Sequence, residues 1–133
     1  MTISFSLYSY LRFAAGRLSD IIRETGAGID KLKKIRKILE DKKARDIVIL
    51  DVRKLTWITD YLVIATGETN IQTRAIAEEI IEKFDNPPFS IEGFETSWIL
   101  LDYGDIVIHI FLPEVRVFYN LERLWGDAER ISP

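Results

Sequence analysis

The stretch from Trp98 to Trp125 constrains the fold more than any other part of the chain. It predicts two apolar strands around a tight turn, followed by a short aromatic-rich helix. A two-residue turn made by Tyr103 and Gly104 places Asp102 opposite Asp105, and side chains alternate between the two faces of the hairpin. Both faces are then apolar, as in strands that are covered on both sides.

This turn predicts which side chains face each other across the hairpin. On one face Trp98 lies opposite His109 and Leu100 opposite Val107, with Phe111 beyond them. Asp102 and Asp105 face each other there, and directly opposed like charges destabilise a strand pair. A basic group of a partner would relieve that repulsion. The other face carries Ile99, Leu101, Ile106, Ile108 and Ile110.

The middle of the chain alternates between strand and helix patterns. Residues 47–50 and 61–65 are continuous aliphatic runs, which are typical of strands buried on both faces. Thr69 and Gln72 have the spacing of a capping box, and they predict the start of a helix that must stop at Asn86-Pro87-Pro88.

A short strand at 89–91, the hairpin and a helix over 114–124 complete the predicted order of elements, α-α-β-β-α-β-β-β-α. This order predicts an α/β fold with a mixed β-sheet of about five strands flanked by helices. We expect three regions, namely an N-terminal helical extension at 1–28, a domain at 29–128 and a tail at 129–133.

The N-terminal extension has its own apolar pattern. Leu7, Leu11, Ala14, Leu18 and Ile21 follow a 4,3,4,3 spacing, which predicts an amphipathic helix that ends near Gly26 and Gly28. Its apolar stripe needs a surface to cover it. A transit peptide is the alternative, because such segments are amphipathic, contain arginine and are poor in acids.

Charge is distributed unevenly along the chain. Residues 31–45 hold eight bases and two acids, whereas residues 46–133 hold seven bases and sixteen acids. The acidic body repels nucleic acid, so direct reading of DNA is not expected. The apolar residues within 31–45 have helical spacing, and the lysines there form either the solvated face of an amphipathic helix or a contact with RNA phosphates.

Several motifs together resemble the ribosomal silencing factor family, also called RsfS or Iojap. The resemblance runs from about Leu32 to Ala128. It includes the sequences at 44–52, 59–67 and 91–93 with Gln72 between them, and the whole block from Trp98 to Trp125. Within that block the joint spacing of Trp98, Asp102, Gly104, Asp105, His109, Phe111, Arg116, Tyr119, Glu122 and Trp125 is specific.

The resemblance implies a nucleotidyltransferase-like architecture and a function. Family members bind the fourteenth protein of the large ribosomal subunit, hinder joining of the small subunit and so repress translation, or they assist large-subunit assembly. We therefore expect a cytoplasmic protein that is a monomer on the ribosome, with a homodimer as an alternative state when free. The predicted partner-binding residues are Trp98, Leu100, Asp102, Tyr103, Asp105, His109, Phe111, Arg116 and Tyr119.

An enzyme with a nucleotidyltransferase-like fold is the alternative, and the residues speak against it. Nucleotidyl transfer needs paired carboxylates that hold metal ions. The candidate turn Gly67-Glu68-Thr69 is followed by Asn70, Ile71 and Gln72, without such a pair. The chain has no cysteine and one histidine, so we expect no catalytic site, no cofactor and no metal. No run of 18 apolar residues occurs, so no membrane span is expected.

Three aromatic or charged positions have structural alternatives to partner contact. His109 either packs and hydrogen-bonds within the domain or contacts the partner directly. Trp98 is either a core residue or an exposed interface residue. Arg116, Tyr119 and Glu122 have a three-residue spacing, which also fits a network within one helix, and Trp125 fits a cap on the core.

Overall fold

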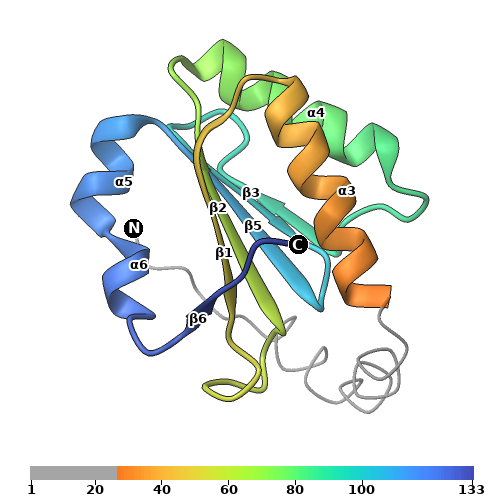
Figure 1. Ribbon diagram of the computed structural model, residues 1–133. Coiled ribbons are helices and arrows are strands. Elements are labelled where there is room, and N and C mark those ends of the chain that lie inside the picture. The colour runs from red at the N-terminus through yellow and green to blue at the C-terminus, as the bar shows by residue number, and fades with distance from the viewer. Residues whose placement is uncertain (1–26) are drawn as a thin grey trace.

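The computed structural model describes residues 27–133. Its centre is a six-stranded sheet in the order β3-β4-β5-β2-β1-β6, with helices on both sides (Figure 1). β2 and β5 are parallel, and the other neighbouring strands are antiparallel. The predicted α/β class with a mixed sheet is therefore confirmed.

From residue 27 to the end of the hairpin the elements follow one another in the predicted order. Their bounds are α3 (Ala27–Asp41), β1 (Arg45–Asp51), β2 (Tyr61–Thr66), α4 (Asn70–Lys83), β3 (Ser90–Glu92), β4 (Trp98–Asp102), β5 (Ile106–Phe111), α5 (Pro113–Tyr119), α6 (Leu121–Leu124) and β6 (Glu129–Arg130). The helix predicted over residues 7–21 and the transit-peptide alternative lie outside the described residues. The expected boundary after residue 28 falls in the first turn of α3.

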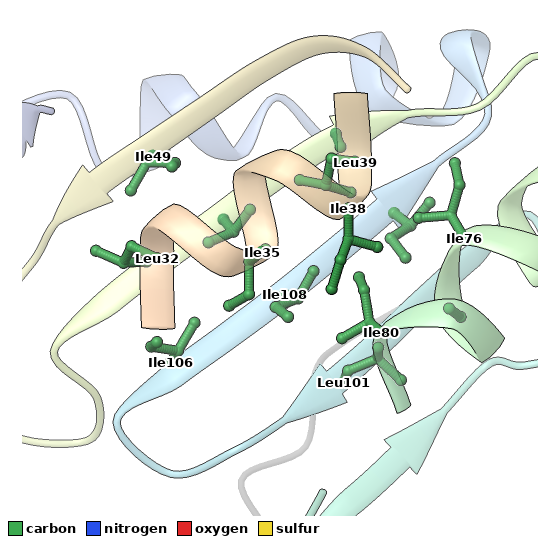
Figure 2. Packing of buried hydrophobic residues seen from close by; sticks show 14 of the residues in the cluster. Leu32, Ile35, Ile38, Leu39, Ile49, Ile76, Ile80, Leu101, Ile106 and Ile108 are labelled. Atoms are coloured by element: carbon green, nitrogen blue, oxygen red, sulfur yellow. The ribbon is translucent and has the colours of Figure 1, made fainter. Parts of the chain in front are cut away.

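Helices α3 and α4 cover one face of the sheet. The stripe of α3 that begins with Leu32 and Ile35 is fully buried, as its helical spacing predicts. Figure 2 shows this stripe over Ile106 and Ile108 of β5, with Ile76 and Ile80 of α4 beside it. This layer covers one apolar face of the hairpin. That face carries Ile99, Leu101, Ile106, Ile108 and Ile110.

Helices α5 and α6 lie on the opposite side of the sheet from α3 and α4 (Figure 1). Leu121 of α6 packs into a second buried cluster with the other face of the sheet. Residues of that cluster include Leu50, Val52, Leu62, Ile64, Trp98, Leu100, Val107 and Phe111. Because both faces are covered, the hairpin is buried on both sides, as its apolar pattern predicts.

The predicted capping residues Thr69 and Gln72 start α4, and they also join it to α3. The Thr69 side chain accepts a hydrogen bond from the Gln72 backbone N–H at 3.1 Å. The side-chain oxygen Oε1 of Gln72 accepts from the Glu68 backbone N–H at 2.7 Å, and the side-chain nitrogen Nε2 donates to the backbone carbonyls of Lys42 and Lys43. The cap therefore ties the start of α4 to the chain that leaves α3.

Two strands differ from the sequence prediction. The run at 47–50 was expected to be buried on both faces, but Ile47 and Val48 are only half-buried while Ile49 and Leu50 are buried. β1 lies next to the two-residue β6, so its first half has little cover. β6 itself was not predicted, because two residues carry no readable alternation. It lies in the segment that we expected to be a tail, and Ile131 donates its backbone N–H to Ile49.

The segment predicted as one helix over 114–124 is instead two. Asn120 adopts the left-handed conformation with φ 45° and separates α5 from α6. A short polar side chain such as asparagine tolerates this conformation, which allows the helix to turn over the sheet. None of the helices in residues 27–133 is long and apolar enough to cross a membrane.

Candidate functional site

The hairpin turn is shifted by one residue from the prediction. Tyr103 donates its backbone N–H to the Ile106 carbonyl at 2.9 Å, so Gly104 and Asp105 form the turn. Gly104 has φ +90° at the first turn position, where a residue without Cβ is favoured. Trp98 therefore faces Phe111, and Leu100 faces His109. The predicted pairs were wrong, but each residue keeps its face because the shift in register is two residues.

The predicted repulsion between Asp102 and Asp105 is absent, because the two side chains have different partners. The Asp102 carboxylate accepts a hydrogen bond from the Gly104 N–H at 2.9 Å. The Asp105 carboxylate accepts from Lys31 of α3 at 3.1 Å, and Asp102 faces Val107 across the hairpin. Both carboxylates are largely buried. The chain's own groups therefore satisfy the charges that we expected a partner to neutralise.

Trp98 and His109 form a buried aromatic cluster under α5. The Trp98 indole N–H donates to His109 Nδ1 at 3.0 Å, a diagonal contact across the hairpin. The Trp98 ring centroid lies 4.7 Å from those of both Phe111 and Tyr119. Trp98 is 3% exposed, so it is a core residue. The cluster links the sheet to the last turn of α5.

His109 is neutral in this cluster. Its Nδ1 accepts a hydrogen bond from Trp98, so the ring proton is on Nε2. Burial lowers the pKa of His109 from 6.5 to about 3, because the charged form loses its hydration. The structural alternative for this residue, packing and hydrogen bonding within the domain, is the one observed.

Arg116 fixes α5 to the sheet and to α6. Its guanidinium donates to Glu122 Oε1 at 3.0 Å and to Thr66 Oγ1 at 2.8 Å, and its side chain is 11% exposed. In a continuous helix, residues six apart are separated by about 9 Å along the axis and point in different directions. The break at Asn120 brings Arg116 and Glu122 together, so this network depends on the two-helix form of the segment.

The predicted site residues divide between two sides of the sheet. Trp98, Leu100, His109, Phe111, Arg116 and Tyr119 lie together under or on α5. Tyr103 instead packs edge-on against Phe84 of the α3–α4 layer, with ring centroids 4.9 Å apart. Burial raises the pKa of Tyr103 to about 12. Asp105 is joined to α3 through Lys31. Tyr103 and Asp105 are therefore not part of the cluster under α5.

The outer side of α5 and α6 carries exposed apolar side chains that the predicted site did not include. Val117, Phe118 and Leu124 are 79%, 80% and 73% exposed, and we call these three residues the α5–α6 patch. Phe118 also contacts the half-buried Tyr119 ring edge-on at 5.0 Å. The sequence held a signal for the patch. Val117, Phe118 and Tyr119 are consecutive, and a helix cannot turn three consecutive residues toward one core.

Gly93 is the last residue of the family-like sequence at 91–93, and its backbone conformation requires glycine. Its φ is +69°, and a Cβ added there would lie 2.0 Å from the Trp98 carbonyl oxygen. Only glycine fits this close approach. Thr96 donates to the Gly93 carbonyl at 2.8 Å, so the turn that precedes β4 is compact and sets the start of the hairpin.

Three of the eight bases in the segment 31–45 pair with acids on other elements of the described structure, among them Lys31 with Asp105. Lys42 pairs with Glu79 of α4 at 3.5 Å, and Arg45 pairs with Glu68. Lys33 and Lys37 are exposed on α3, which fits the solvated face that the helical spacing predicts.

At Gly67 the chain continues into the α4 cap. Among residues 27–133 no three His, Asp or Glu side chains gather where they could hold a metal ion.

Comparison with known proteins assigns the family. The family model described as "Ribosomal silencing factor during starvation" matches residues 26–133. The chain belongs to the ribosomal silencing factor family. The resemblance read from the motifs at 44–67 and 91–125 is thus confirmed.

Relatives and a solved structure agree with this assignment. The ribosomal silencing factor of Bacillus subtilis is 43% identical over 93 residues, which are 67% of this chain and 79% of that protein. The mouse protein named "Mitochondrial assembly of ribosomal large subunit protein 1" is 34% identical over 95 residues, or 66% of this chain and 42% of that protein. A crystal structure of a Chromobacterium violaceum protein has a TM-score of 0.70 and 36% identity, covering 77% of this chain and 88% of that one.

Proposed function

We propose that this ribosomal silencing factor binds the large ribosomal subunit through its fourteenth protein and blocks joining of the small subunit. The observation that carries the proposal is the α5–α6 patch on a member of this family. Exposed apolar side chains over a rigid base are typical of the centre of a protein interface. A bound domain of this size represses translation by occupying a surface, without catalysis.

The predicted site residues contribute to this interface in two ways. Trp98, Leu100, His109 and Phe111 are buried, so they support α5 from below and hold its outer surface in one shape. Tyr119 and Arg116 are partly exposed and lie beside the patch. Asp102, Tyr103 and Asp105 shape the hairpin turn, and their proposed contribution is to the edge of the contact.

Charge supports a basic partner. The segment 46–133, which contains the hairpin and the α5–α6 patch, holds sixteen acids and seven bases. Complementary charge raises the association rate with a basic ribosomal protein and disfavours contact with exposed RNA. We place the protein in the compartment that contains its ribosomes, the cytoplasm in a bacterium, and propose that it is monomeric when bound.

Two matched substitutions test the proposed surface. Phe118→Asp places a charge in the α5–α6 patch, and Ile71→Asp places the same charge at the start of α4, where the side chain is equally exposed at 82%. Both variants should melt within a few degrees of the parent. Phe118→Asp should weaken co-sedimentation with large subunits at least about tenfold, because hot-spot losses are of this size or larger. Equal binding by both variants would place the contact elsewhere.

Large-subunit assembly is the second candidate function. The observation in its favour is the similarity to the mouse protein, whose name describes assembly of the mitochondrial large subunit. Cells depleted of the protein should then accumulate incomplete large-subunit particles. If they contain only mature subunits and an excess of joined ribosomes, repression of joining is the main role.

A further inference from the structure

The α5–α6 patch is built on two helices, and the second of them is too short to hold its own place. Leu124 lies on α6, which has four residues. A helix of a single turn is unstable by itself in water, so contacts with the rest of the domain must fix it. Leu121 within α6 and Trp125 just after it pack against the buried cluster on this side of the sheet.

These two apolar contacts leave one movement of α6 unrestrained. Leu121 and Trp125 are four residues apart, so they lie above one another on the same side of the turn. Rotation about the line that joins them would keep both side chains in the core and would move Leu124. A third contact away from that line is therefore needed to fix the direction in which Leu124 points.

Arg116 and Glu122 make this third contact. Arg116 Nε donates to Glu122 Oε1 at 3.0 Å, and Nη1 of the same guanidinium donates to Thr66 Oγ1 at 2.8 Å. Thr66 is the buried last residue of β2, so this end of the contact is anchored in the sheet. The side chains of Arg116 and Glu122 are 11% and 21% exposed, so solvent screens the ion pair less than it would on the open surface.

The shape of the guanidinium suits a contact with two elements. It is rigid and planar and offers several donors in fixed directions, whereas the ammonium of lysine is a compact point charge. The Arg116 backbone carbonyl also accepts from the Asn120 N–H at 2.8 Å, at the break between the helices. Arg116 thus joins β2, α5 and α6.

We propose that Arg116 is a positioning residue for the ribosome-binding surface. Its contacts with Thr66 and Glu122 fix α6 against α5, and so fix Leu124 relative to Phe118. The guanidinium itself does not need to touch the ribosome. This inference rests on the proposed function of the α5–α6 patch.

A double-mutant cycle with Leu124 tests the positioning role in co-sedimentation with large subunits. Leu124→Ala should weaken binding by the parent at least about fivefold. In the Arg116→Lys background the same substitution should cost less than about twofold, because Leu124 is already displaced. Arg74→Lys is the matched control, since Arg74 of α4 pairs with Glu95 at 2.9 Å, and in it Leu124→Ala should keep its full effect. Equal costs of Leu124→Ala in all three backgrounds would overturn the proposal.

Conservative variants separate positioning from direct contact with the partner. Arg116→Lys keeps the positive charge but cannot serve both acceptors, so it should weaken binding at least about fivefold. Glu122→Gln keeps an oxygen acceptor for Arg116 Nε and should bind within about twofold of the parent, whereas Glu122→Ala should bind as weakly as Arg116→Lys. Full binding by Arg116→Lys, or equal losses in the two Glu122 variants, would refute positioning through this contact.

Amide hydrogen exchange on the free full chain tests the local effect without the ribosome. In Arg116→Lys and Glu122→Ala, the amides of residues 121–126 should exchange at least about tenfold faster than in the parent, while those of β4 and β5 keep their protection. Unchanged exchange at 121–126, or equal acceleration in the strands, would contradict the proposal. If Phe118→Asp binds as well as the parent, the proposed surface fails and the positioning role fails with it, even where exchange at 121–126 responds.

Discussion

Trp98→Ala should destabilise the domain strongly, because the indole ring fills the cluster between the sheet and α5. The side chain is 3% exposed and contacts Phe111 and Tyr119. Truncation of a buried tryptophan costs about 3–5 kcal/mol. The substitution also leaves His109 Nδ1 without its donor, which adds about 1–3 kcal/mol. The free energy of unfolding should therefore fall by roughly 4–8 kcal/mol.

Denaturant unfolding of Trp98→Ala and Trp98→Phe separates the two contributions. Trp98→Phe keeps an aromatic ring but removes the N–H donor, so it should lose about half as much stability or less. For a domain of this size the alanine variant should melt roughly 15–30 °C below the parent. A loss under about 1 kcal/mol for Trp98→Ala would refute the buried cluster and make Trp98 an exposed contact residue.

Three further predictions concern His109, the helix break and charge. Because burial lowers the pKa of His109 to about 3, the unfolded chain binds a proton below pH 6.5 that the folded chain does not. The free energy of unfolding should therefore fall by about 1.4 kcal/mol per pH unit as the pH drops from 6.5 toward 3. Denaturant titrations at several pH values measure this dependence, and His109→Gln should remove the contribution of His109 to it. Asn120→Gly should keep or raise the melting temperature, whereas Asn120→Val should cost about 1–2 kcal/mol at a φ of 45°. Binding to large subunits should weaken as added salt shortens the Debye length from about 10 Å toward 3 Å, and salt-independent affinity would contradict the charge argument.

The sequence was sufficient to predict the layers of the fold. Periodicity identified α3 and α4, and the doubly apolar hairpin required cover on both faces, which the structure provides. The turn was harder, because Tyr103-Gly104 and Gly104-Asp105 both place a glycine in a two-residue turn. The second choice puts Gly104 at the first turn position with φ +90°, and Asp102 then binds its N–H.

Only part of the candidate site could be predicted from the sequence, and the reason differs from that for the turn. A strongly patterned block such as 98–111 carries the family resemblance, but its side chains are largely interior. The exposed surface comes from Val117, Phe118 and Leu124, and the break at Asn120 separates the helix of the first two from the helix of Leu124. A single left-handed residue is not predictable from helix periodicity, since asparagine also occurs within helices and at their caps. Tertiary contacts such as Lys31 with Asp105 are equally invisible in sequence.

Subunit joining measured on sucrose gradients tests the central claim most directly. Purified small and large subunits are mixed under joining conditions with increasing amounts of the protein, and with the Phe118→Asp variant as control. The parent protein should co-sediment with free large subunits and reduce the peak of joined ribosomes in proportion to its occupancy. An undiminished peak of joined ribosomes at a saturating concentration, with no protein on the large subunits, would contradict the proposed function.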